Sequence, residues 1–387
     1  HGDVQIHGAE KEAFLKVAAD PMAGDTSLTL ESAPDGWQVG DKLVLTGTHL
    51  TEAVYAEPTE PRHGQQTEDE ELIITKIEGN TIYFDKPLEY DHEGARADLK
   101  AYVANYTRNV RFGTENADDV PVHQRGHTMF MQSDRIDVRY AEFHELGRTD
   151  KSERAFDVES LDNVESDSNI KTRYSMHLHR AGVDDVDNPA MVIGNSVWGS
   201  PGWGYVHHDS NAIMTDNAAY DVYGAAFVAE TGNEIGRWSH NIAIKSIGNG
   251  GGAKWHEDVA AFDLGRSGAG FWFQGRLVEA VDNVAAGVPG GHGFVYMSRD
   301  AGGPIDVTND TAHMSEALRY TDETPIHIPA ISSFSGNEAF AVGVGLEVIK
   351  PNSQQYHDVR SVIDDFTGWE VGTGIHLQYT AHYTLKD

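Results

Sequence analysis

The second half of the chain repeats one pattern of polar and apolar positions. Each copy has an asparagine, small or apolar residues, a short loop, a glycine, an aromatic residue and an alternating apolar run. The copies contain Asn195, Asn217, Asn241, Asn283 and Asn337. The first two intervals are about 22 and 24 residues, a period typical of the coils of a β-solenoid. Because alternation predicts strands and glycine permits tight corners, we predict an all-β fold with a right-handed parallel β-helix over residues 121–387.

Aligning the copies on their glycine–aromatic corners predicts which side chains point into the solenoid. The inward columns are Met176, Tyr205, Phe227, Phe271, Phe294, Leu346 and Ile375, and then Leu178, His207, Ala229, Phe273, Tyr296, Val348 and Leu377. The outward rows are His177, Val206, Val228, Trp272, Val295, Glu347 and His376, and then His179, His208, Glu230, Gln274, Met297, Ile349 and Gln378. The repeated asparagines are expected to form an interior amide ladder, because buried amides need hydrogen-bond partners.

The first third of the chain has a different pattern. Short alternating segments predict antiparallel strands at 27–30, 41–46, 71–77 and 80–84, the last two joined as a hairpin. The polar segment 48–70 is expected to be a long loop. We assign residues 1–120 to a β-rich cap. We expect this cap to cover the exposed edge of the first coil, because a free solenoid edge must be protected.

Two histidines carry the strongest chemical signal. His177 and His179 are one residue apart on a predicted strand, so their side chains project from the same face. In the register above, His208 and Glu230 lie beside them on the next coils, which are spaced about 4.8 Å apart. Three imidazoles with an open fourth position are the ligand set of a catalytic zinc-type centre. We therefore predict a divalent metal centre at His177, His179 and His208 on the outer wall.

The sequence allows two roles for His207. The register turns its side chain inward, where it would be a hydrogen-bonded core residue, but a one-residue bulge would exchange its place with that of His208. The chain contains 20 histidines, and most histidines of an acidic protein are ordinary surface groups. The prediction of a metal centre therefore rests on the group of histidines and not on any single one. His207 is an alternative metal ligand. A purely structural metal site would need four protein ligands.

Charge and composition limit the classes of partner that the protein is expected to bind. The formal net charge is −32, from 61 acidic and 29 basic side chains, which argues against a nucleic-acid partner because such a partner requires a basic footprint. Dispersed acidic groups favour solubility in salty media, so we expect a marine or halotolerant source. The chain has no cysteine, which excludes disulfides and thiolate ligands. It also has no run of about 18 apolar residues, so no membrane span is expected.

The chain also resembles a known family, the secreted and cell-surface hyaluronan-degrading proteins that combine an eight-glycine domain with parallel β-helix repeats. The matches are collinear from Trp37-Gln38-Val39-Gly40-Asp41 to Gly293-Phe294. They include Ala97-Asp98-Leu99-Lys100, Thr107-Arg108-Asn109-Val110, Gly126-His127, Tyr174 to His179 with Ala181-Gly182, Ser210-Asn211, Ala219-Tyr220, Phe227 with Glu230, and Gly270-Phe271-Trp272-Phe273.

This resemblance implies an endo-acting polysaccharide depolymerase that requires a divalent cation and works outside the cell or in the periplasm. It transfers functional positions to His177, His179, Asn211 and Glu230. Around residues 206–210 this chain has one residue more than the family pattern, which again leaves His207 and His208 as alternatives. The chain lacks the family's cysteines and carboxy-terminal extension, so the glycan is not defined beyond a hyaluronan-like acidic polysaccharide.

Two reaction types are compatible with such a substrate. Hydrolysis needs two carboxylates about 5.5 Å or about 6.5–9.5 Å apart, and the predicted outer face offers Glu230 and Asp209. Elimination from a uronate needs a cation beside the sugar carboxylate and a base for the proton at C5. His177, Arg173 and Tyr174, together with a metal, supply those parts. The residues slightly favour a lyase, with Glu230 completing the catalytic candidates.

Substrate contacts are expected along the same wall. Trp272 lies in the outward row about 15 Å from His177, so it is predicted to stack on a sugar ring, unless it packs under a loop. The other substrate-binding candidates are Arg180, Asn211, Lys254 and Arg299. A non-catalytic glycan-binding solenoid using Trp203, Trp255 and Trp272 is the alternative function. Calcium is an alternative cation, at Asp184, Asp185 and Asp187.

Overall fold

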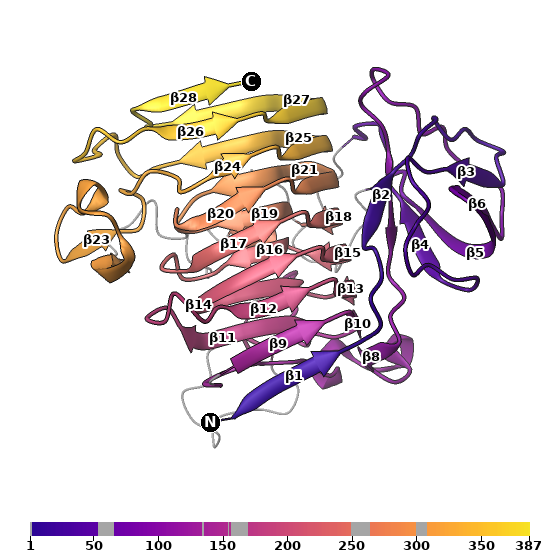
Figure 1. Cartoon of the computed structure of the whole chain (residues 1–387), viewed down its shortest axis with the longest axis horizontal. Coiled ribbons are helices and arrows are strands. Elements are labelled where there is room, and N and C mark those ends of the chain that lie inside the picture. Colours follow the sequence, from indigo (N-terminus) through magenta and orange to yellow (C-terminus); the bar gives the residue numbers. More distant parts are fainter. Residues whose placement is uncertain are drawn as a thin grey trace.

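The chain folds as a stack of parallel coils with a smaller antiparallel sheet beside them (Figure 1). The computed structural model describes residues 2–52, 66–133, 135–153, 155, 169–248, 264–298 and 308–387. Most of the predicted loop at 48–70 lies outside these residues. The predicted fold class, an all-β parallel β-helix, is confirmed.

Three walls of parallel strands form the solenoid. The first wall contains β8 (Val110–Gly113), β10 (Ala141–His144), β13 (Ser196–Ser200), β15 (Ala218–Tyr223), β18 (Ile242–Ile247) and the first halves of β21 (Val284–Tyr296), β25 (Glu338–Ile349) and β27 (Thr367–Gln378). The second wall contains β11 (Met176–Gly182), the first half of β14 (Tyr205–Thr215), β16 (Ala225–Ala229), β19 (Ala269–Phe273) and the second halves of β21, β25 and β27. The third wall contains β1 (Asp3–His7), β9 (Arg135–Arg139), β12 (Ala190–Ile193), the second half of β14, β17 (Ile235–Ser239), β20 (Val278–Val281), β24 (Phe334–Ser335), β26 (Ser361–Asp364) and β28 (Tyr383–Lys386).

Short secondary-structure elements lie in the loops between the strands of the coils. A two-stranded antiparallel ribbon is formed by β22 (Thr308–Asp310) and β23 (Glu323–Pro325). The described 3-10 helices are η1 (Ala117–Asp119), η2 (Val122–Gln124), η4 (Leu264–Arg266), η5 (Thr311–His313) and η6 (Glu316–Leu318). No helix in the described ranges is long and apolar enough to cross a membrane.

The predicted register of the second wall is confirmed pair by pair. Met176 pairs with Tyr205, and Tyr205 pairs with Phe227 on the following coil. The same column continues through Phe271, Phe294, Leu346 and Ile375. The rings of Tyr205, Phe227, Phe271 and Phe294 stack face to face at centroid distances of 4.7, 4.8 and 4.8 Å, which is the spacing between neighbouring strands. Hydrophobic burial along this column therefore fixes the register of the wall.

The predicted asparagine ladder is also present. The ladder runs through Asn195, Asn217, Asn241, Asn283 and Asn337, and the amide Nδ2 of each of the first four donates to the Oδ1 of the next at 2.9–3.1 Å. All five side chains are fully buried. Each Nδ2 also donates to a main-chain carbonyl, for example Asn195 to Val138. The ladder satisfies polar groups at the interior corner that would otherwise destabilise the stack.

The antiparallel sheet has the strand order β2-β7-β4-β5-β6-β3. Its strands are β2 (Phe14–Lys16), β3 (Ser27–Thr29), β4 (Lys42–Leu45), β5 (Glu70–Glu78), β6 (Thr81–Phe84) and β7 (Tyr102–Asn105). The predicted segments match β3 to β6, and the β5–β6 hairpin turns where Glu78 pairs with Thr81.

The expected position of this sheet was wrong. The sheet runs alongside the coils instead of covering the first one (Figure 1). Tyr106 and Phe14 belong to the same buried cluster as Trp198 and Tyr220 of the first wall, and the Tyr106 hydroxyl donates to the carbonyl of Ala219 at 3.1 Å. The outward aromatic side chains of the first wall explain this placement, because they need an apolar cover.

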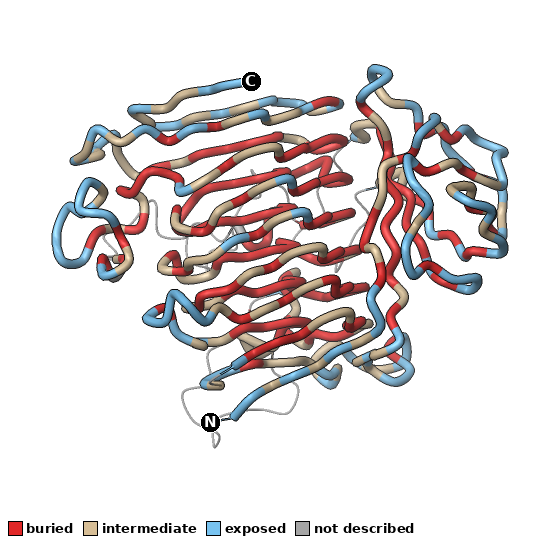
Figure 2. Tube along the Cα trace, viewed as in Figure 1, coloured by how far each residue is buried: buried red, intermediate tan, exposed pale blue. Residues whose placement is uncertain are grey.

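The amino-terminal segment belongs to the solenoid. β1 pairs with β9 in parallel along its whole length, and β8 pairs with β10. Both strands lie within the range assigned to the cap, so part of residues 1–120 forms coil structure. Figure 2 shows the buried positions running through the coils, whereas β28 at the opposite end is partly to fully exposed.

Candidate metal centre

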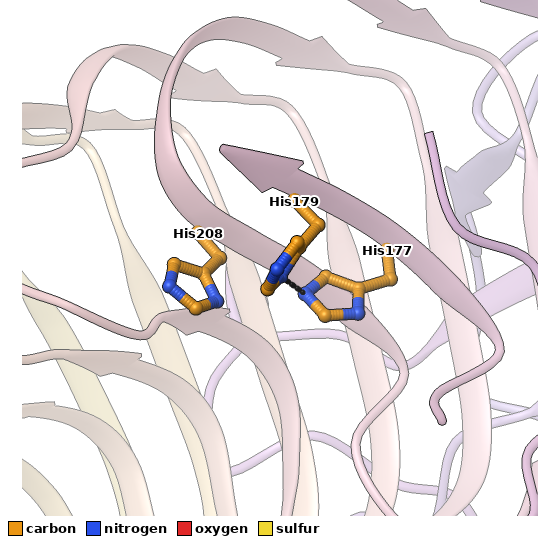
Figure 3. Close-up of side chains that lie close together, drawn as sticks. All are labelled: His177, His179 and His208. Carbon is orange, nitrogen blue, oxygen red and sulfur yellow. Dashed lines mark hydrogen bonds between the residues drawn. The ribbon is translucent and has the colours of Figure 1, made fainter. Parts of the chain in front are cut away.

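Two neighbouring strands of the second wall bring three histidines together. β11 carries His177 and His179, and β14 carries His208, which pairs directly with His179. Side chains alternate along a strand, so these three imidazoles leave the outer face of the wall while Leu178 points inward. Figure 3 shows the three rings facing a common point. This is the arrangement that the repeat register predicted.

The distances between the rings fit a bound ion. Nδ1 of His179 lies 3.3 Å from Nε2 of His177, and one ligand nitrogen from each of the three histidines lies within 4.8 Å of the others. Two nitrogens bound tetrahedrally to one zinc ion, at about 2.0–2.1 Å each, would be about 3.4 Å apart. The three histidines can therefore hold a divalent metal without large rearrangement.

His177 is held in one orientation. Its Nδ1 donates to the carbonyl of Thr172 at 3.2 Å, which leaves the Nε2 lone pair facing the cluster. Thr172 has a φ of 71°, a left-handed conformation that is strained for a β-branched residue. The ring of Tyr174 packs 5.3 Å from that of His177. We infer that this local strain is tolerated because it fixes the orientation of the His177 ring.

His177 is buried more deeply than an outer-wall position suggested. Its side chain has 0% exposure, and burial lowers its pKa to about 3, although the charge of Glu230 opposes that shift. Burial and the positive neighbours His208 and Arg180 also lower the pKa of His179. Both imidazoles are consequently neutral at neutral pH, which is the form that binds metal. A fully buried His177 cannot touch a sugar, so the structure contradicts its expected catalytic role and leaves it as a candidate metal ligand.

Glu230 joins the cluster from the third coil, as the register predicted. It follows β16, and its carboxylate Oε2 lies 3.0 Å from Nδ1 of His208 and 3.8 Å from Nε2 of His177. The side chains of Glu230 and His208 are only 10% and 14% exposed. Burial pulls the pKa of His208 down, but the close contact with Glu230 and its negative charge outweigh burial and raise that pKa.

The structure separates His207 from His208. His207 is fully buried inside the solenoid, where its Nε2 donates to the carbonyl of Ser210 at 2.6 Å and its Nδ1 accepts the indole N–H of Trp238 at 3.3 Å. Burial lowers its pKa to about 4. Both ring nitrogens are already used, so His207 is a core residue and its assignment as a metal ligand is corrected.

The tryptophans proposed as sugar platforms are not on the surface. Trp272 leaves the outer face of β19 as predicted, but its exposure is 0%, and its indole N–H donates to the carbonyl of Met297 at 2.9 Å. Its ring meets that of Trp203, which is also fully buried, at 5.7 Å. Trp272 therefore packs in a second buried layer outside the wall, and its predicted stacking role is wrong. Trp255 lies outside the described residues.

The remaining substrate-binding candidates differ in exposure and in their contacts. Arg180 is exposed directly after His179, and Arg173 is half-buried and donates from Nη1 to Oγ1 of Thr172 at 2.6 Å. The amide of Asn211 is buried and donates to the carbonyls of Asp185 and Val186, so it holds the 183–189 loop instead of facing a ligand. Lys254 and Arg299 lie outside the described residues.

The carboxylates of the acidic loop do not form a group of converging ligand atoms among the described residues. Its carboxylates at Asp184, Asp185 and Asp187 are exposed. The Asp185 carboxylate accepts hydrogen bonds from the main chain of Asp187 and the side chain of Asn188. In the part of the chain that the structure describes, the histidine cluster is the only group of three or more ligand residues with converging atoms.

Sequence reasoning missed a buried acid that supports the site. Glu234 is 1% exposed, and its carboxylate accepts the main-chain N–H groups of Asp209, Thr231 and Gly232 at 2.7–3.0 Å. These bonds fix the turns that follow His208 and Glu230. The only signal for it was the turn composition of residues 230–234, because a buried carboxylate and a solvated one look the same in sequence.

The fold and the cluster together define a parallel β-helix protein with a three-histidine site of metal-binding geometry. A family profile described as CEMIP beta-helix matches residues 124–345, more than half of the chain. The chain belongs to the CEMIP beta-helix family.

Relatives occur in Dictyostelium discoideum. A G8 domain-containing protein is 25% identical over 325 residues, which is 79% of this chain and 25% of that protein. Communication mutant protein F is 22% identical over 290 residues, covering 74% of this chain and 22% of the relative. Protein rliB is 23% identical over 314 residues, covering 78% and 25%. The chain spans about a quarter of the length of these relatives.

Solved structures with some likeness are phage tailspikes. Tailspike gp49 of Pseudomonas phage LKA1 aligns with a TM-score of 0.21 and 12% identity over 97% of this chain and 62% of the tailspike. Gp54 tailspike of Acinetobacter baumannii bacteriophage AP22, solved with a capsular saccharide, aligns with a TM-score of 0.21 and 8% identity over 97% and 61%. At these TM-scores neither likeness supports an inference about this chain.

Proposed function

We propose that this protein is a metal-dependent, endo-acting depolymerase of a uronate-containing, hyaluronan-like polysaccharide, and that it works by β-elimination outside the cell or in the periplasm. The observation that carries the proposal is the convergence of three imidazoles and the Glu230 carboxylate on one patch of the outer wall. Membership of the CEMIP beta-helix family supports the substrate class. The matched segments make up only about a quarter of the relatives. The activity is therefore a proposal about this chain and is not taken over from those longer proteins.

Imidazole donors define the ion that would fit. His177, His179 and His208 would bind it through one ring nitrogen each, a donor set that favours a zinc-like transition metal over calcium. When bound, the ion would neutralise the sugar carboxylate and so acidify the neighbouring C5 proton. Thr172 and Tyr174 position the ring of His177.

Glu230 is the residue placed to move a proton. It lies at the edge of the cluster, and its contact with His208 holds the carboxylate in place. In the proposed step Glu230 takes the C5 proton, the C4–O bond breaks, and the departing oxygen takes a proton from water. Arg173 and Arg180 would pair with acidic groups of the polymer, since a protein with a net charge of −32 must attract an anion locally.

The carboxylates near the histidine cluster favour elimination over hydrolysis. Hydrolysis requires a second carboxylate about 5.5 Å or about 6.5–9.5 Å from the first. The nearest sequence candidate, Asp209, accepts a hydrogen bond from the amide of Asn233 at 2.6 Å, and among the described residues Glu230 is the carboxylate in contact with the histidines. The glycan-binding alternative loses two of its three stacking platforms, because Trp203 and Trp272 are buried; the third, Trp255, lies outside the described residues.

The test is incubation of the purified protein with a panel of acidic polysaccharides. Elimination generates an unsaturated uronate that absorbs in the ultraviolet, whereas hydrolysis generates new reducing ends without that absorbance. We expect shorter chains and rising ultraviolet absorbance with the wild-type protein, and neither with His179→Ala. Reducing ends without absorbance would replace the lyase assignment with a hydrolase. Tight binding without any cleavage would overturn the enzyme assignment.

A further inference from the structure

Three neighbouring segments of the chain carry His127, Arg148 and Arg173 and lie side by side next to β11. The main-chain N–H of Arg148 donates to the carbonyl of Arg173 at 2.9 Å. The segment that carries His127 runs alongside both, because Gly147 N–H donates to the Gly126 carbonyl at 2.7 Å and Thr128 N–H donates to the Tyr174 carbonyl at 3.3 Å. We call His127, Arg148 and Arg173 the basic triplet. All three side chains are half-buried.

The charge of Arg148 acts on both of the other side chains. Burial, followed by the charges of Arg148 and Arg173, lowers the pKa of His127 to about 4. Burial and then the charge of Arg148 lower the pKa of Arg173. His127 is therefore neutral at neutral pH, while the two arginines stay charged. The triplet combines two adjacent positive charges with a neutral imidazole.

Neither arginine of the triplet forms an ion pair with a carboxylate among the described residues. This is unexpected in a chain with 61 acidic and 29 basic side chains. Arginines on the neighbouring coils are paired: Arg111 with Glu142, Arg125 with Glu145, and Arg139 with Asp137. Like charges held close together and partly out of water repel each other, and an anion between them would remove that cost.

The triplet is connected to the metal centre through one residue. Nη1 of Arg173 is bonded to the hydroxyl of Thr172, and the carbonyl of Thr172 accepts the Nδ1–H of His177. A group bound by Arg173 would therefore lie next to the ion-binding patch. The triplet sits on the side toward the amino-terminal coils, whereas His208 and Glu230 sit on the following coils.

We propose that the basic triplet is an acidic-sugar subsite, in which Arg148 and Arg173 bind the carboxylate of the next uronate along the polymer from the uronate that reaches the metal centre. The inference rests on the proposed function. Guanidinium groups suit this task because they bind carboxylates through paired hydrogen bonds, and the imidazole of His127 can add a neutral donor. Arg148 would then set specificity for uronate polymers.

The experiment measures binding of intact polymer on a non-cleaving Glu230→Gln background. Arg148→Gln is compared with Arg360→Gln, which removes an equal charge from an exposed position on a distant coil. The ligands are a uronate polymer, the same polymer with its carboxylates reduced to alcohols, and a sulfated polymer without carboxylates. We expect Arg148→Gln to weaken binding of the uronate polymer about tenfold or more, equal to about 1.4 kcal/mol, and Arg360→Gln to change it less than about twofold.

The ligand comparison identifies the group that is bound. For the carboxyl-reduced polymer, Arg148→Gln and Arg360→Gln should bind equally. Arg148→Lys should keep the salt dependence of binding but recover only part of the affinity, because an ammonium group cannot form the paired bonds. It also serves as the second variant if the glutamine variant folds poorly.

Two outcomes would overturn the subsite. One is equal binding of the uronate polymer by Arg148→Gln and Arg360→Gln. The other is a loss restricted to the sulfated polymer, which would reassign the triplet to sulfate. Failure of the proposed function is distinguishable, since it would appear as absence of cleavage by the wild-type protein while this binding comparison still gives its answer.

Discussion

Nδ1 of His208 and Oε2 of Glu230 lie 3.0 Å apart although the two residues sit on different coils. The contact exists because the coils stack in register, with Ala229 beside His207 and therefore Glu230 beside His208. The cluster thus spans three coils: His177 and His179 on the first, His208 on the second and Glu230 on the third. The solenoid repeat itself builds this constellation.

Glu230→Gln should separate a proton acceptor from a metal ligand. The change keeps the size of the side chain and removes its charge, so we expect metal content to be retained and turnover to fall roughly 10²–10⁴-fold. Elemental analysis and the ultraviolet assay on one preparation check this. Loss of the metal with the activity would instead make Glu230 a fourth ligand and the site a closed, structural one.

His177→Ala and His179→Ala should both lose the metal but should differ in stability. His177 is fully buried and bonded to Thr172, so its removal should lower the free energy of unfolding by about 1–3 kcal/mol. His179 is only half-buried, and its loss should cost less. Denaturant unfolding of the metal-free proteins measures the difference, with the exposed His382→Ala as control. Equal stabilities would contradict the inner position of His177.

His207→Leu should change stability with pH but keep the metal. The folded pKa of about 4 lies below the unfolded value of about 6.5. The unfolded state therefore binds more protons as the pH falls from about 6.5 to about 4, and the wild-type protein loses up to about 3 kcal/mol from this residue over that window. At neutral pH the variant should be less stable than the wild-type protein, because the partners of His207 lose their hydrogen bonds. Its free energy of unfolding should also fall less steeply as the pH is lowered. The prediction would be contradicted by a His207→Leu variant that binds no metal and whose free energy of unfolding depends on pH as in the wild-type protein. That result would make His207, and not His208, the metal ligand.

Trp272→Ala should behave as a core mutation, like Phe273→Ala. Trp272 is buried against Trp203, and Phe273 is stacked on Tyr296 at 4.5 Å. Each replacement should destabilise the fold by roughly 3–5 kcal/mol and leave the kinetics of the folded fraction unchanged on long and short oligosaccharides. Selectively weaker binding of long chains by Trp272→Ala would restore it as a sugar platform.

The fold and the register could be derived from the sequence because the repeat imposes them. Glycine at the corner, an aromatic residue after it and strict alternation leave one way to stack the coils, and a slip of one residue would expose Phe227 and Phe271. Asn195 and its counterparts confirm the same alignment at another corner. His177, His179, His208 and Glu230 could be grouped on this basis alone.

Burial outside the solenoid could not be derived in the same way. Alternation indicates whether a side chain points into the coil, but it does not indicate whether another layer covers the outer face. His177 and Trp272 both point outward and are both fully buried, because the ring of Tyr174 packs against His177 and the ring of Trp203 packs against Trp272. The same limit explains the misplaced cap, since the outward aromatic row of the first wall was not recognised as a docking surface.

We propose above all that His177, His179 and His208 bind one divalent ion that the reaction requires. The most direct measurement is elemental analysis of the purified protein, combined with activity before chelation, after chelation and after return of zinc. We expect about one ion per chain, loss of activity on chelation and recovery of activity when the metal is returned. Full activity in a chelated protein that contains no stoichiometric metal would contradict it.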